Sequence, residues 1–119
     1  MKRMTKTRLA ITLSKMEVFE SPKAALEQYP TDSEIAAEVL WQAYMLGDIE
    51  NKSVLDLGCG SGILGLGAAL LGASSLTMID KDTNALELSK INLSKEAFTY
   101  FELSLFTNKL VYFMSFDRS

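Results

Sequence analysis

The stretch Val54-Leu55-Asp56-Leu57-Gly58-Cys59-Gly60-Ser61-Gly62-Ile63-Leu64 decides the fold. Residues 53–57 have the apolar character of a short strand, residues 58–62 form a glycine-rich turn, and an apolar helix is predicted from 63 to about 71. A strand that runs into such a turn and then into a helix is typical of nucleotide-cradling loops. Glycine lets the backbone approach a ligand, and the helix N-terminus presents N–H groups. The stretch therefore predicts a ligand-binding loop in an α/β fold.

A second strand and helix follow the loop. Residues 75–79 are predicted as a strand that ends at Asp80, and residues 83–93 as a helix with Asp82 as its N-cap. The order strand, helix, strand, helix indicates a parallel sheet with right-handed crossovers. Residues 53–94 are therefore predicted to form a βαβα core.

The N-terminal part of the chain is predicted to be helical. Residues 5–18 have apolar side chains at helical spacing, and a shorter helix is expected around residues 24–28, between two prolines. Residues 31–34 read Thr-Asp-Ser-Glu, a capping box that opens a further helix, which Gly47 ends. The expected buried face of this helix is Ile35, Val39, Leu40, Ala43 and Leu46. Residues 1–47 are interpreted as a helical lid over the core.

Residues 97–119 differ from the rest of the chain. They are rich in aromatic residues and contain no glycine or proline, and two strands are predicted, over 98–105 and 110–116. One interpretation is a segment translated out of its ancestral frame, or past a deletion, that packs as a hairpin over the sheet and leaves an apolar, aggregation-prone edge. The alternative is a divergent third strand.

Composition excludes several classes of protein. The chain of 119 residues holds one domain at most, and its net charge of −3 gives no general nucleic-acid signature. The basic residues at the N-terminus (Lys2, Arg3, Lys6 and Arg8) are either a solvated end or a contact for RNA phosphates. With one cysteine and no histidine, neither a metal site nor a catalytic thiol is expected. No apolar run reaches the roughly 18 residues that span a bilayer, so we expect no membrane contact and a cytoplasmic protein.

The glycine turn has three interpretations. Residues 60–65 match G-x-G-x-x-G, which suggests a dinucleotide, but the first glycine lies three residues beyond the strand and Asp56 would face a diphosphate at close range. S-adenosyl-L-methionine carries a sulfonium and an ammonium and no phosphate, so it suits an acid there. Asp80, about twenty residues on, is placed to accept hydrogen bonds from a ribose. The third interpretation is a turn without a ligand.

The sequence also resembles a known family. Residues 54–64 look like the first motif of class I methyltransferases, and residues 26–31, LEQYPT, closely resemble a signature of the methyltransferase-like protein five family and its archaeal relatives. That family methylates the N6 amino group of an adenine in small-subunit ribosomal RNA. The resemblance covers roughly residues 16–94. It implies a Rossmann-like class I methyltransferase fold with a parallel sheet, truncated after the first two or three strands.

The resemblance implies a set of cofactor-binding residues. From the lid, Gln28 and Thr31 would touch S-adenosyl-L-methionine, and Asp80 would hold its ribose. Each of the three has a simpler alternative role: Gln28 as a surface amide, Thr31 as a helix cap and Asp80 as an acid that ends a strand. The complete set of expected cofactor-binding residues is Gln28, Thr31, Asp56, Gly58, Gly60, Ser61, Gly62, Ile63 and Asp80.

The chain departs from the family where catalysis takes place. The family's Asn-Pro-Pro-Phe element, which orients the flipped-out adenine, is absent because no proline follows Pro30. The acid expected after the third strand is absent as well, and no catalytic residue is assigned. We therefore expect a methyltransferase of ribosomal RNA adenine N6 that lacks its catalytic half and is inactive alone. The alternative is a non-catalytic module that binds the cofactor or a protein. The family also implies a small zinc-binding activator protein that pairs with a sheet edge.

Overall fold

The computed structural model describes residues 4–16, 31–58, 60–96, 102–106 and 109–115. Helices and strands alternate in the middle of the chain, as the sequence predicts. A strand hairpin ends the described part. The elements are α1 (Lys6–Ser14), α2 (Ser33–Met45), β1 (Ser53–Leu57), α3 (Ile63–Leu70), β2 (Ser75–Asp80), α4 (Thr83–Lys95), β3 (Glu102–Phe106) and β4 (Lys109–Ser115).

The four strands form one sheet in the order β1-β2-β4-β3. β1 and β2 are parallel, with Ser53 opposite Ser75 and Leu57 opposite Ile79, which confirms the predicted parallel pair. β4 pairs with β2 in the antiparallel direction, and β3 pairs with β4. The aromatic-rich segment therefore supplies two strands, as expected. They extend the sheet edge to edge instead of lying over it, so the sheet is mixed.

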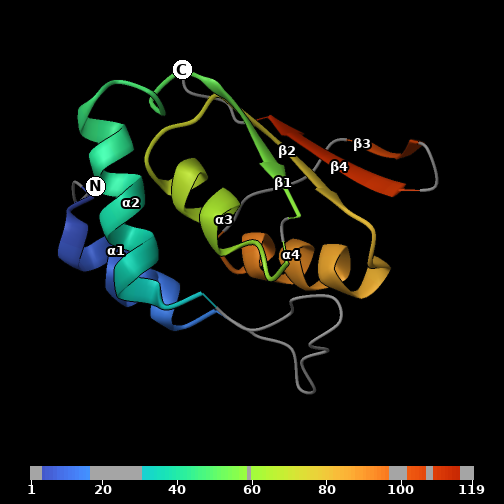
Figure 1. The fold of residues 1–119 in the computed structure, drawn as a ribbon, viewed down its shortest axis with the longest axis horizontal. Helices are drawn as coiled ribbons and strands as arrows, with labels where there is room; N and C mark the ends of the chain where they lie inside the picture. Colours follow the sequence, from blue (N-terminus) through green and yellow to red (C-terminus); the bar gives the residue numbers. More distant parts are fainter. Residues whose placement is uncertain (1–3, 17–30, 59, 97–101, 107–108, 116–119) are drawn as a thin grey trace.

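The helices form two groups (Figure 1). α3 contacts β1 and β2, and α4 contacts β2 and β4, so these two helices cover one face of the sheet. α1 and α2 pack on each other and on α3. Within the described residues, no helix combines the length and apolar character needed to cross a membrane. This arrangement leaves the loop between β1 and α3 at the sheet end that α1 and α2 approach.

The core lies between these helices and the helix-covered face of the sheet. Leu76 and Met78 of β2 are fully buried there, while Leu55 and Leu57 of β1 point to the other face and are 55% and 69% exposed. From α1, Leu9 and Leu13 join the core, as their spacing predicts. The helix ends at Ser14, earlier than the predicted residue 18. The helix expected around residues 24–28 lies outside the described residues.

The predicted buried face of α2 is wrong for three of its five residues. Leu40 is buried and Ala43 is partly buried, but Ile35, Val39 and Leu46 are 63%, 58% and 77% exposed. Close helix packing explains the difference. Ala36 and Ala37 are buried, and Leu40 lies directly against Gly67 of α3, where a side chain would have no room. Small residues let helices approach closely, so α2 turns Ala36, Ala37 and Leu40 to the core, and Ile35 and Val39 away from it.

The start of α2 also differs from the prediction. Asp32, and not Thr31, is the N-cap: its Oδ1 accepts hydrogen bonds from the backbone N–H groups of Glu34 (2.8 Å) and Ile35 (3.1 Å). The N-cap is therefore one residue later than predicted, and the expected capping box from Thr31 to Glu34 is wrong. Both residue types cap helices well, and the sequence alone could not decide between neighbours.

Candidate functional site

The glycine loop joins β1 to α3 beside the end of β2. Gly58, Gly60 and Gly62 all have positive φ angles, of 68°, 55° and 87°. Such angles favour glycine, because a side chain there is strained. A Cβ atom placed on Gly60 would meet nothing within 4 Å. The backbone at Gly60 is therefore open to close approach by a ligand.

Asp80 at the end of β2 holds this loop. Its Oδ2 accepts a hydrogen bond from the backbone N–H of Gly60 at 3.0 Å, and its Oδ1 accepts one from the N–H of Asp82 at 2.9 Å. The predicted position of Asp80 beside the loop is thus confirmed, and its bonds give it a structural role as well. A carboxylate oxygen can accept more than one hydrogen bond, so these bonds leave capacity for a ligand hydroxyl.

Asp56 is the second acid at the loop. Its side chain lies on the helix-covered face of β1, where Oδ2 accepts a hydrogen bond from the N–H of Gly65 in α3 at 3.1 Å. Burial raises the pKa of Asp56 to about 6; the Gly65 N–H opposes this rise, and the negative charge of Asp80 adds to it. Among the residues that the structure describes, no positive charge therefore contributes to the pKa of Asp56. A cationic group on a ligand would supply one.

A pocket of about 180 Å³ lies where the loop meets the N-terminal helices. Three of the expected site residues line it: Thr31, Ser61 and Ile63. Since Asp32 caps α2, the alternative role of Thr31 as helix cap is wrong, and its position at the pocket agrees with a ligand contact. Gln28 lies outside the described residues. The complete lining is Leu13, Ser14, Met16, Thr31, Ser33, Ser61 and Ile63.

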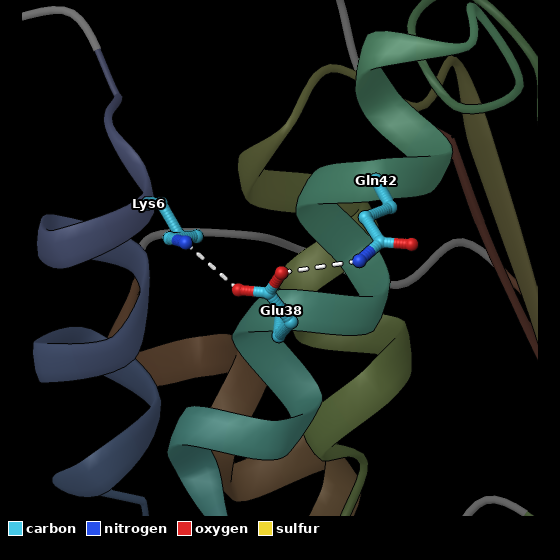
Figure 2. A network of polar contacts seen from close by, with 3 residues as sticks. All are labelled: Lys6, Glu38 and Gln42. Carbon is cyan, nitrogen blue, oxygen red and sulfur yellow. Dashed lines mark hydrogen bonds and ion pairs between the residues drawn. The ribbon is translucent and has the colours of Figure 1, made fainter.

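A second hollow, of about 300 Å³, lies between α1 and α2 and contains none of the expected site residues. Two of its charged residues pair with each other: Lys6 Nζ lies 2.8 Å from Glu38 Oε2 (Figure 2). Gln42 Nε2 also donates a hydrogen bond to Glu38 Oε1, at 3.1 Å. The hydrogen bond from Lys6, followed by that from Gln42, lowers the pKa of Glu38. Both charged side chains are about half exposed, so the ion pair adds little stability. We assign this hollow to helix packing.

Two polar residues of α4 also contact the loop, and sequence analysis missed them. Ser89 Oγ donates to the carbonyl of Gly60 at 2.9 Å, and Asn92 Nδ2 donates to the carbonyl of Ser61 at 2.8 Å. Both side chains are fully buried. The sequence did contain a signal for them: two polar residues, three positions apart, lie on the apolar side of a helix. Buried polar side chains need hydrogen-bond partners, so such a pair indicates contacts with another segment.

The comparison with protein families identifies the class of protein. The fold and the loop agree with a Rossmann-like methyltransferase, and the model of the ribosomal protein L11 methyltransferase (PrmA) family matches residues 25–116. The chain belongs to this family. Membership in a methyltransferase family implies use of S-adenosyl-L-methionine in general. The match runs past Lys95 and through β4, so it does not support an out-of-frame origin of the aromatic-rich segment, which stays a prediction.

Some individual relatives are named as methyltransferases of ribosomal RNA, and others as ribosomal protein L11 methyltransferases. The rRNA N(6)-adenosine-methyltransferase METTL5 of Danio rerio is 43% identical over 70% of this chain and 41% of its own length. The METTL5 enzyme of Drosophila melanogaster is 38% identical over 78% of this chain and 44% of its own length. Among solved structures, the RNA methyltransferase PH1948 of Pyrococcus horikoshii is 48% identical with a TM-score of 0.73, covering 76% of this chain and 46% of that one. The chain thus spans less than half the length of these relatives.

Proposed function

We propose that this chain binds S-adenosyl-L-methionine at the glycine loop, as the cofactor-binding part of a methyltransferase that acts on adenine N6 of ribosomal RNA. One observation carries the proposal: two acids near the ends of adjacent parallel strands hold the loop and the helix that follows it. Asp80 accepts the N–H of Gly60 in the loop, and Asp56 accepts the N–H of Gly65 in α3. Ligands of open α/β sheets bind at the carboxyl ends of the strands, which is where both acids lie.

The chemistry of these residues suits the cofactor. Asp56, with its raised pKa, would lie near the positive charges of the methionine part, and Asp80 would accept hydrogen bonds from the ribose hydroxyls. Thr31, Ser61 and Ile63 would enclose one end of the molecule. Their pocket of about 180 Å³ is smaller than the roughly 300–1,000 Å³ of most ligand sites, so it takes only part of the cofactor. When bound, the cofactor supplies a methyl group activated by its sulfonium.

The cofactor assignment is tested by titration calorimetry of the purified chain. S-adenosylhomocysteine should bind and NADH should not. Heat with NADH and none with S-adenosylhomocysteine would show that the loop is a dinucleotide site instead.

The RNA substrate is proposed from the relatives, whose names state rRNA N6-adenosine methylation. The Asn-Pro-Pro-Phe element is absent from these 119 residues, and positioning of the reacting groups supplies much of such catalysis. We therefore expect no transfer of labelled methyl groups from cofactor to ribosomal RNA by this chain alone. Transfer by the pure chain would contradict this part of the proposal.

The proposed activator is a small zinc-binding protein that adds a strand to the sheet. β1 and β3 are the outer strands of the described sheet and are the candidate edges for such pairing. A mixture of the two purified proteins should elute together in size-exclusion chromatography. Separate elution at all concentrations would count against this partner.

A further inference from the structure

Ser89 and Asn92 of α4 are the polar side chains that are fully buried among the residues whose burial is described, at 0% and 1% exposure. Burying a polar group costs free energy unless it is hydrogen-bonded. Both side chains donate a hydrogen bond to the glycine loop. Ser89 donates to the carbonyl of Gly60 at 2.9 Å, and Asn92 donates to the carbonyl of Ser61 at 2.8 Å. Two successive carbonyls of the loop are thus directed toward the same helix.

The loop also rests directly on Ser89. A Cβ atom on Gly62 would lie 2.9 Å from Ser89 Oγ, so only glycine permits this contact. From the other side, Asp80 accepts the N–H of Gly60 at 3.0 Å. The peptides around Gly60 are therefore held from the end of β2 and from α4 together.

The geometry of the peptide bond determines where the loop's N–H groups point. In a trans peptide the carbonyl and the N–H of the following residue point in opposite directions, and the described chain has no cis bonds. The carbonyl of Gly60 points to α4, so the N–H of Ser61 points away from it. The same holds for the carbonyl of Ser61 and the N–H of Gly62. Ser61 also lines the 180 Å³ pocket.

The geometry points to Ser89 and Asn92 as positioning residues, which orient the N–H groups of Ser61 and Gly62 toward the carboxylate of the bound cofactor. N–H groups suit a carboxylate, because hydrogen bonds to a charged acceptor are stronger than those to a neutral one. The inference rests on the proposed function, since it requires S-adenosyl-L-methionine at the loop. Neither side chain touches the cofactor; both act through the loop backbone.

The test compares Ser89→Ala and Asn92→Ala with Leu93→Val, in the full chain. Leu93 is a buried core residue of the same helix, so its variant loses stability without removing a bond to the loop. Affinity for S-adenosylhomocysteine is measured by calorimetry, and stability by urea unfolding. Each alanine variant should bind about tenfold more weakly or worse, as expected for a lost hydrogen bond that orients charged-group contacts. Leu93→Val should bind within about twofold of wild type.

A conservative variant and a second readout separate orientation from folding. Ser89→Cys keeps a weaker donor of similar size, so its affinity should lie between wild type and Ser89→Ala, and it replaces Ser89→Ala if that variant does not fold. In amide NMR spectra, added S-adenosylhomocysteine should shift the Ser61 and Gly62 signals less in Ser89→Cys than in Leu93→Val.

Unchanged affinity in both alanine variants, or an equal loss in Leu93→Val, would overturn the positioning role while leaving the proposed function intact. Absence of binding by the wild-type chain would overturn both.

Discussion

The backbone N–H of Gly60 donates a hydrogen bond of 3.0 Å to Oδ2 of Asp80, which lies twenty positions later in the chain. This bond joins the loop after β1 to the end of β2, and Asp80 Oδ1 continues the connection to the N–H of Asp82. The acid that is expected to hold the cofactor's ribose therefore also holds the loop on which the cofactor would lie. Loss of Asp80 should affect loop geometry and ligand contact together.

Replacement of Asp80 by alanine should weaken both folding and binding. Hydrogen bonds to a charged group contribute roughly 1.5–3 kcal/mol each, so urea unfolding should show a loss of at least that size. Affinity for S-adenosylhomocysteine should fall about tenfold or more. The matched control is Asp82→Ala, which removes the N-cap of α4 and should cost about 1 kcal/mol of stability with little change in affinity. Equal affinities for the two variants would contradict the ligand role of Asp80.

Replacement of Asp56 by asparagine should stabilise the folded protein at neutral pH. The pKa of Asp56 rises from 3.8 to about 6 on folding, so the folded state binds more protons in this interval and stability falls as pH increases through it. Asparagine removes the charge, and its side-chain oxygen can still accept the Gly65 N–H. The variant should gain on the order of 1–3 kcal/mol at pH 7 and nothing at pH 3.5, as measured by urea unfolding. A variant that is less stable at pH 7 would show that Asp56 is compensated in the free protein.

The same Asp56→Asn variant should bind the cofactor more weakly, although it is more stable. S-adenosyl-L-methionine carries one more positive charge than S-adenosylhomocysteine. The variant should therefore lose more affinity for S-adenosyl-L-methionine than for S-adenosylhomocysteine. Calorimetry with both ligands measures the difference. Equal losses for the two ligands would place the sulfonium away from Asp56. A gain in stability together with a loss of binding is common at functional sites.

Gly62→Ala should be more harmful than Gly47→Ala. Both positions have similar positive φ angles, 87° and 81°, so both variants acquire the left-handed strain of roughly 1–2 kcal/mol. A side chain on Gly47 meets nothing within 4 Å, whereas one on Gly62 would meet Ser89 Oγ at 2.9 Å. Overpacking should add about 1–3 kcal/mol at Gly62 only, measurable by urea unfolding. Equal stabilities would mean that the loop moves away from α4 without cost.

The orientation of α2 is tested by Leu40→Ala and Val39→Ala, which are adjacent in the chain. Leu40 is 7% exposed and Val39 is 58% exposed. Thermal unfolding should show a loss of about 2–5 kcal/mol for Leu40→Ala and a change within about 0.5 kcal/mol for Val39→Ala. The opposite order would support the buried face that the apolar pattern predicts.

Much of the core could be predicted from the sequence because its signals are local. The strand at 53–57 and the start of the helix at Ile63 agree with the structure, as does the N-cap at Asp82. Glycine turns, caps and short apolar runs act over a few residues and leave a direct trace in the sequence.

The errors come from contacts between distant segments. The buried face of α2 depends on Gly67 of α3, which offers space for Leu40, and apolar periodicity within α2 contains no information about that neighbour. In the same way, Ser89 and Asn92 are ordinary helix residues until the loop around Gly60 is placed against them. Pairing of β4 with β2 in the antiparallel direction is likewise decided by tertiary structure.

Binding of the cofactor at the glycine loop is tested most directly by amide NMR of the isotope-labelled chain during titration with S-adenosylhomocysteine. The signals of Gly58, Gly60 and Ser61, and that of Asp80, should shift in a saturable manner, while those of Lys6 and Glu38 at the α1–α2 hollow should stay unchanged. Saturable shifts confined to the α1–α2 hollow, or the absence of shifts at millimolar ligand, would contradict the assignment of the loop as the cofactor site.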